Sequence, residues 1–301
     1  MTETLSPSPK TGRLWVVATP IGNLGDLSQR AVSVLEMVET VLAEDTRKTG
    51  RLLKQLGIGP PSFLSLYEHN EAQRINTVLE LLAQGREVAL VSSAGTPLIS
   101  DPGYRIVRAC REKGYSVEPV PGPSAPVTAL VASGIPPLPY TFLGFFPRGE
   151  QDKKRLFGSF AGVGTTLVFF ERKSRIGSTL QTAYQCLGAR EICLARELTK
   201  RHEEFIFFRL GQWDKLPREP RGEFTVVVGP PEESGPSSRE EVTRILMEEQ
   251  GSGDRPKRVV ERVASRVRGW SKKAVYDLYL RTGKGDSGYG SEGGASSQQE
   301  R

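Results

Sequence analysis

The chain has 301 residues, of which 37% are hydrophobic and 32 are glycine, an apolar share that is ordinary for a globular protein. This composition excludes a wholly disordered chain, and the length predicts two domains with a small appendage. No apolar run approaches the roughly 20 residues of a membrane span, and the polar first 13 residues do not resemble a secretory signal. Three cysteines and two histidines, without a Cys-x-x-Cys pair, argue against disulfides and structural zinc and favour a cytoplasmic protein.

The net charge of +6 is concentrated in one segment near the C-terminus. Residues 255–284 contain ten Lys or Arg and two acidic residues, a net charge of +8, so the rest of the chain sums to −2. A localised basic face is typical of a polyanion-binding protein, although a solvated helical surface could have the same composition. We therefore expect nucleic acid to bind this segment.

The first half of the chain alternates short apolar runs with helical patterns, after a lead at 1–12 that is expected to be disordered. The predicted strands span residues 14–18, 41–43, 63–66, 88–91 and 117–120, with helices at about 28–38, 46–56, 71–84 and 103–113 between them. This alternation predicts a mainly parallel sheet covered on both faces, in an N-terminal α/β domain at 13–126.

The pattern changes beyond the proline-rich stretches at 121–126 and 135–139. Predicted strands at 141–146, 166–170, 191–195, 205–209 and 224–228 include neighbours with short connections, which indicates a mixed sheet in a second α/β domain at 127–231. Three short helices at 232–282 follow, and the last two, joined by a Gly-containing turn, fit a helix-turn-helix. The Gly- and Ser-rich tail at 283–301 is expected to be disordered.

Three loops rich in Gly and Pro follow predicted strands of the first domain. They are TPIGNLGD at 19–26, SSAGTPLISDPG at 92–103 and PGPSA at 121–125, and none contains a dinucleotide fingerprint or a P-loop. Ligands bind doubly wound sheets at the carboxyl ends of the strands. Three such loops therefore predict a ligand site, with ordinary turns as the alternative.

Two polar clusters follow the second and third predicted strands. The first contains Glu44, Asp45 and Arg47, and the second contains Glu68 and His69. Carboxylates and imidazole are the groups that general acid–base catalysis uses. Asp45 could equally cap the helix that follows it, because Asp is a favoured N-cap residue.

In this order, these motifs resemble the tetrapyrrole methylase superfamily of S-adenosylmethionine-dependent methyltransferases. They are most similar to the branch that methylates the ribose 2′-oxygen of a cytidine in small-subunit ribosomal RNA. The resemblance covers residues 13–282 and is carried by ATPIGNLGD at 18–26, AEDTR at 43–47, YEHNE at 67–71, SAGTPLISDPGY at 93–104, PGPSA at 121–125, FLGFFPR at 142–148, ELTKRHEE at 197–204, GEFTVVV at 222–228 and SKKAVYDL at 271–278. Two departures occur: Ser93 replaces a usual Asp, and Lys173-Ser174 replaces a usual Pro-His.

The resemblance implies two α/β domains of the tetrapyrrole methylase type, a cleft between them for S-adenosylmethionine, no metal, and a helical RNA-binding appendage. It assigns the donor contacts to Pro20, Gly95, Thr96, Pro97, Ser124, Ala125, Phe170 and Thr225. The base that takes the ribose proton is expected among His69, Glu68, Glu44 and Asp45, in falling order, with Arg47 holding a phosphate. RNA is expected to bind Arg255, Lys257, Arg258, Arg262, Arg266, Arg268, Lys272 and Lys273.

The expected partners are small-subunit (16S) ribosomal RNA in the assembled 30S subunit and, by resemblance, a second copy of the chain. Two alternatives stay open at this point. A methylase of a small tetrapyrrole would not need the basic helices, and a non-catalytic nucleic-acid-binding regulator would not need the donor loops.

Overall fold

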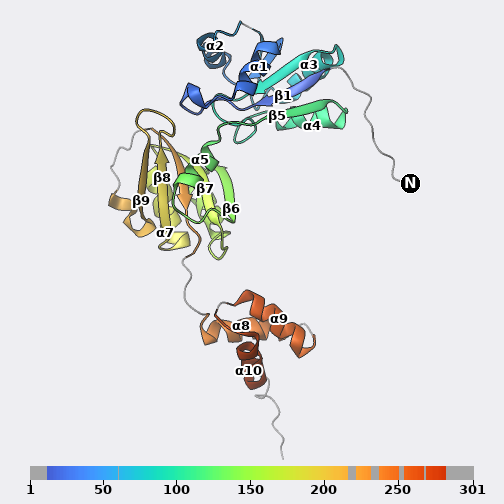
Figure 1. The fold of residues 1–301 in the computed structure, drawn as a ribbon. Helices are drawn as coiled ribbons and strands as arrows, with labels where there is room; N and C mark the ends of the chain where they lie inside the picture. Colours follow the sequence, from blue (N-terminus) through green and yellow to red (C-terminus); the bar gives the residue numbers. More distant parts are fainter. Residues whose placement is uncertain are drawn as a thin grey trace, which may run out of the picture. The chain divides into compact units, whose positions relative to one another are not determined.

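The structure, a computed structural model, describes residues 12–59, 61–215, 222–231, 237–250, 254–267 and 269–282 (Figure 1). The lead at 1–12, apart from Gly12, and the tail at 283–301 lie outside these residues, as do the expectations of disorder for them. The chain forms two compact units, Met1–Glu232 and Glu233–Arg301. Among the described residues, no helix is long and apolar enough to cross a bilayer.

The first unit begins with a five-stranded parallel sheet in the order β3-β2-β4-β1-β5. Its strands are β1 (Arg13–Val17), β2 (Thr40–Ala43), β3 (Ser62–Ser65), β4 (Glu87–Val91) and β5 (Ser116–Val120). The intervening helices are η1 (Leu24–Asp26), α1 (Gln29–Met37), α2 (Thr46–Gln55), α3 (Glu71–Ala83) and α4 (Tyr104–Glu112). Alternate residues of β1 enter different hydrophobic clusters, Leu14 one and Trp15 the other, because helices cover both faces.

A second five-stranded sheet follows, in the order β6-β7-β10-β8-β9. Its strands are β6 (Tyr140–Phe145), β7 (Thr166–Arg172), β8 (Glu191–Arg196), β9 (Glu204–Arg209) and β10 (Glu223–Val228), and its helices are α5 (Ala125–Ala132), α6 (Glu150–Gly158), α7 (Ile176–Leu187) and η2 (Leu210–Lys215). β6 and β7 are parallel and the other pairs are antiparallel, as the short connections predict. The sequence did not predict α6, because its buried face consists of only Lys153 and Phe157 in a charged segment.

The described residues of the second unit form three helices, α8 (Arg239–Gln250), α9 (Pro256–Arg266) and α10 (Lys272–Thr282). Their apolar residues, among them Val242, Leu246, Val263 and Val275, form one buried cluster. Ser271 caps α10, its hydroxyl accepting a hydrogen bond from the Ala274 N–H at 3.1 Å. The helical appendage that the sequence predicts is therefore present.

Candidate functional site

A cavity of about 650 Å³ in the first unit is lined by loops of both sheets. The residues from the first sheet include Ile21, Glu44, Gly95, Asp101 and Ser124, which follow β1, β2, β4 and β5. The residues from the second sheet include Phe145, Phe170, Lys173, Leu198 and Thr225. Because parallel strands end at one edge of a sheet, loops distant in sequence meet at this cavity.

The Gly- and Pro-rich loops after β1, β4 and β5 are tied to one another by hydrogen bonds. Thr19 and Gly95 exchange two backbone hydrogen bonds of 2.9 and 3.0 Å. The Thr96 hydroxyl donates to the Pro123 carbonyl at 3.0 Å, which joins the second loop to the third. Gly95 has a φ of +79°, a conformation that disfavours residues with a side chain, so its backbone forms the cavity surface.

An aromatic wall forms the side of the cavity contributed by the second sheet. Phe170 of β7 lies beside Thr225 of β10 in the antiparallel register. The ring of Phe170 meets Phe142 edge-on at 5.1 Å and Phe145 at 5.2 Å. Such packing fixes the ring, so the cavity has a rigid apolar surface beside the polar loops.

Six of the eight donor contacts expected from sequence line this cavity. They are Gly95, Thr96, Ser124, Ala125, Phe170 and Thr225. Pro20 and Pro97 are not among the lining residues, and Pro97 is buried. The two prolines shape the loops rather than the cavity surface.

Of the base candidates, Glu44 lines the cavity and Asp45 does not. The Ser93 hydroxyl donates a hydrogen bond of 2.8 Å to Glu44, so the departure from the usual Asp provides a neutral donor to this carboxylate. Asp45 caps α2 by accepting hydrogen bonds from the Lys48 N–H at 2.9 Å and the Arg47 N–H at 3.0 Å. These bonds, the one from Lys48 first, hold the pKa of Asp45 below its usual value. Asp45 is therefore the N-cap residue of α2, as the alternative interpretation of the sequence expected.

The structure does not bring His69 or Glu68 to the cavity. Both side chains are exposed in the turn after β3, and neither lines the cavity. The His69 ring stacks on Tyr67 with a centroid distance of 5.4 Å and nearly parallel planes. Arg47 is also exposed and does not line the cavity, so its expected phosphate contact finds no support in this geometry.

Asp101 belongs to the SAGTPLISDPGY motif but is not among the base candidates that the sequence indicates. It lines the cavity and is partly buried. Burial first, and then the Glu44 carboxylate, raise the pKa of Asp101 to about 6, and Lys48 opposes them. In the sequence, Asp101 is part of the turn-like segment Ser100-Asp101-Pro102-Gly103, which does not by itself indicate a role in a site. Its polar environment depends on β2 and β4 being neighbours, which residue spacing does not reveal.

A buried carboxylate fixes the loop after β7 at the cavity. The Glu171 side chain accepts hydrogen bonds from the Thr179 hydroxyl and the Arg175 guanidinium, both at 2.6 Å, and from the Arg172 N–H at 2.7 Å. Lys173 and Ser174 therefore line the cavity on a rigid support. The cationic residues of the lining are Lys48, Arg172, Lys173 and Lys200, a set typical of a phosphate-binding surface.

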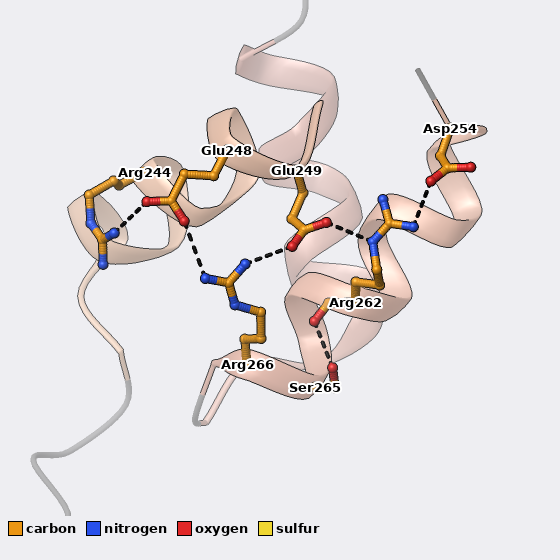
Figure 2. Close-up of polar contacts among 7 residues, drawn as sticks. All are labelled: Arg244, Glu248, Glu249, Asp254, Arg262, Ser265 and Arg266. Carbon is orange, nitrogen blue, oxygen red and sulfur yellow. Dashed lines mark hydrogen bonds and ion pairs between the residues drawn. The ribbon is translucent and has the colours of Figure 1, made fainter. Parts of the chain in front are cut away.

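In the second unit, two of the expected RNA contacts are engaged in an ion-pair network (Figure 2). Arg262 donates to Glu249 at 2.6 Å and to Asp254 at 2.7 Å. Arg266 donates to Glu249 at 2.6 Å and to Glu248 at 3.2 Å. These guanidinium groups join α9 to α8 and so stabilise the helical unit, while their expected contact with RNA stays a prediction.

This network predicts a stability loss at acidic pH. Its hydrogen bonds to Arg262 and Arg266 hold the pKa of Glu249 below its usual value. The stabilisation is therefore complete above the unfolded pKa of about 4.3 and is lost as pH falls through the lower folded pKa. The protection of the α8–α10 amides against hydrogen exchange, taken relative to the intrinsic exchange rate at each pH, should fall below about pH 4. The Glu249→Gln variant should show less protection at pH 7 and a smaller change of protection with pH. The control Asp277→Asn, at an exposed position of α10, should behave as the parent; equal exchange in all three proteins would contradict the network's role.

The remaining expected RNA contacts gather in the first turns of α9 and α10. Arg255, Lys257 and Arg258 lie at the start of α9, and Lys272 and Lys273 at the start of α10. All five are exposed, and neither first turn contains an acidic residue. The N-terminus of a helix is the positive end of its dipole, where cationic side chains are unfavourable by themselves. Their positive charge adds to that of the helix end, so both first turns would attract an anion such as phosphate. Arg268 lies outside the described residues.

The sequence matches known proteins along most of its length. The family of tetrapyrrole (corrin/porphyrin) methylases matches residues 13–214. A protein of Pasteurella multocida, ribosomal RNA small subunit methyltransferase I, is 40% identical over 276 residues, which covers 90% of this chain and 97% of that protein. The chain belongs to this methyltransferase family. Its Escherichia coli O157:H7 member is 39% identical over 277 residues, covering 89% of this chain and 95% of that protein.

Solved structures support the same fold. The methyltransferase CobJ superposes with a TM-score of 0.56 at 18% identity, covering 75% of this chain and 96% of CobJ. Diphthine synthase superposes with a TM-score of 0.58 at 12% identity, covering 72% of this chain and 90% of that enzyme. The predicted tetrapyrrole methylase fold is confirmed, and so is the prediction of a methyltransferase of the family that uses S-adenosylmethionine as methyl donor.

Proposed function

We propose that the chain transfers a methyl group from S-adenosylmethionine to the 2′-oxygen of a cytidine ribose in small-subunit (16S) ribosomal RNA. The observation that carries the proposal is the cavity of about 650 Å³, where the Gly95 loop meets the aromatic wall, in a chain of this family. The substrate is the RNA of the assembled 30S subunit, which places the protein in the cytoplasm.

The residues present fit S-adenosylmethionine. Small-molecule sites have volumes of about 300–1,000 Å³ and combine apolar walls with a few polar groups. Phe170 and Ala125 would hold the adenine, and the backbone around Gly95 and the hydroxyl groups of Ser124 and Thr225 would bind its polar edges and the ribose. Ser124 begins α5 without using its side chain as a cap, which leaves the hydroxyl available.

The donor, when bound, supplies an activated methyl group on a sulfonium, whose leaving group is a neutral thioether. The protein's task is to align the ribose oxygen with that methyl group, exclude water and accept the hydroxyl proton. The hydrogen-bonded loops around Gly95 and Thr96 form a rigid surface that would keep the donor aligned with the ribose oxygen. A carboxylate of the cavity lining is the natural proton acceptor, because neither His69 nor His202 lines the cavity.

Basic residues at two places support RNA as the substrate. Lys48, Arg172, Lys173 and Lys200 line the cavity, where a phosphate beside the target nucleotide would lie. In the second unit, the first turns of α9 and α10 present five exposed cations that would bind phosphates farther along the RNA.

Replacing Arg172 and Lys173 together by Ala should weaken RNA binding while leaving donor binding nearly unchanged. Both side chains are exposed at the cavity, so their loss removes phosphate contacts without a buried defect. We expect KM for the small subunit to rise about tenfold and the salt dependence of binding to flatten by roughly 1–2 in log–log slope. Lys113→Ala, at an exposed position outside the cavity, is the control. An unchanged KM would remove this loop from the RNA path.

A homodimer is part of the proposal. Exposed hydrophobic side chains occur on α5 and just before or at the start of β6: Val127, Val131, Leu138 and Tyr140. Val131 and Leu138 are 73% and 78% exposed. An apolar surface of this kind is typical of an interface, and a second copy of the chain is the occupant that the resemblance implies.

The proposed function is tested by offering the purified protein two substrates with methyl-labelled S-adenosylmethionine. Unmethylated small subunits should become labelled in their RNA, and a tetrapyrrole should not. Label on the tetrapyrrole alone would establish the small-molecule alternative, and no transfer to either would favour the non-catalytic regulator.

A further inference from the structure

We propose that Asp101 is the catalytic base that receives the ribose 2′-hydroxyl proton, an inference that rests on the function proposed above. In this step the 2′-oxygen forms a bond to the methyl carbon while the carbon–sulfur bond breaks and its electron pair stays on sulfur. The hydroxyl proton passes to the Asp101 carboxylate. Charge balances, because the sulfonium becomes a neutral thioether and the carboxylate becomes a neutral acid.

The contacts within the cavity distinguish Asp101 from the other carboxylates. Four line the cavity: Glu44, Asp101, Glu171 and Glu223. Glu171 is held by Arg175 and Thr179, Glu223 by Lys200 at 3.0 Å, and Glu44 by the Ser93 hydroxyl. Among the described residues, none donates a hydrogen bond to the Asp101 carboxylate. Its oxygens are therefore available to a substrate hydroxyl.

The loop that carries Asp101 is anchored on its C-terminal side and strained on its N-terminal side. The buried Glu71 carboxylate accepts hydrogen bonds from the Gly103 N–H at 3.2 Å and the Arg105 N–H at 2.6 Å, which anchors the loop to α3. Leu98 and Ser100 both have a φ of +70°, a left-handed conformation that costs free energy outside glycine. Strain of this kind persists where the surrounding structure enforces it, and it occurs often at active sites.

The charges around Asp101 suit a base that works near neutral pH. Burial and the Glu44 carboxylate raise its pKa to about 6, and the Lys48 ammonium opposes the shift. The other cations of the lining are Arg172, Lys173 and Lys200. A base is most effective when its pKa lies near the working pH, since it is then both deprotonated and strongly basic. Glu44 thus acts as a positioning residue that tunes Asp101.

The test combines single-turnover methyl transfer to unmethylated small subunits with a titration of the ligand-free protein. The wild-type rate should fall as pH drops below about 6, and Asp101→Asn should lose about 100-fold or more at pH 7.5. Donor affinity, measured by calorimetry, should change less than threefold. In ¹³C-carboxyl spectra of aspartate-labelled protein without donor, one resonance should titrate near pH 6 and be missing in Asp101→Asn. Glu44→Gln should move that midpoint to lower pH.

Asp214→Asn, at an exposed position outside the cavity, is the matched control and should keep the wild-type rate. A folded Asp101→Asn that turns over within threefold of wild type would overturn the inference alone. So would a loss of donor affinity as large as the loss of rate. A wild-type protein that leaves the ribose unmethylated would overturn the proposed function and this inference together.

Discussion

Truncation after Pro231 should abolish most of the affinity for small-subunit RNA while leaving S-adenosylmethionine binding intact. The first unit, which ends at Glu232, contains the whole cavity, and the removed helices contain Arg255, Lys257, Arg258, Lys272 and Lys273. Each phosphate contact adds about −0.7 to the log–log salt slope for single-stranded nucleic acid. Five contacts predict a contribution of about −3.5, so the full chain should lose roughly 100-fold more affinity than the truncated chain between 50 and 200 mM salt.

Binding isotherms at several salt concentrations, run beside a sizing column, measure this effect. In a full-length Lys257→Ala/Arg258→Ala variant, the magnitude of the log–log salt slope should fall by about 1–2. Because the chain length is unchanged, this variant separates the effect of charge from the presence of the helical unit. The competing role for the helices is packing within a dimer. Truncation would then change the oligomeric state or melting temperature, with RNA affinity and salt slope unchanged.

Gly95→Val should weaken donor binding at least tenfold, or about 1.4 kcal/mol. A side chain at the Gly95 φ of +79° is strained, and its Cβ would lie 3.1 Å from a methyl group of Ile21 and 3.7 Å from the Pro123 carbonyl oxygen. The loop would have to shift, which would disturb its hydrogen bonds with Thr19. Calorimetry with S-adenosylmethionine measures the loss.

Gly57→Val separates backbone strain from disturbance of the cavity. Gly57 has a similar φ of +73°, and a Cβ there would meet no atom within 4 Å, at a position that does not line the cavity. This control should lose stability but keep donor affinity. A folded Gly95→Val with unchanged donor affinity would remove the loop from the donor site.

The sequence predicted that the Gly- and Pro-rich loops lie together because this placement depends on local signals. Strand–helix alternation gives a parallel sheet, and in such a sheet the Gly- and Pro-rich loops after β1, β4 and β5 share one edge. The order of the strands was not predictable from spacing. His69 follows β3, an edge strand, whereas Asp101 follows β4, the central strand of the sheet, and this order decides which residue lines the cavity.

The ion pairs between helices of the second unit were also not predictable from the sequence. Arg262 and Arg266 belong to the same basic segment as Lys257 and Arg258, and composition does not distinguish them. Their partners lie on α8 and just before α9, 8 to 18 positions away, and become neighbours only when the helices pack. Tertiary contacts, rather than local sequence, decide which of these basic residues form ion pairs between helices.

Nucleoside mass spectrometry tests the central claim most directly. Small subunits from cells that lack this protein would be incubated with the purified chain and S-adenosylmethionine, and their RNA digested to nucleosides. We predict that 2′-O-methylcytidine increases toward one per subunit and that omission of the protein abolishes the increase. A methyl group on a base, on the ribose of another nucleoside, or on no nucleoside of the RNA would contradict the account.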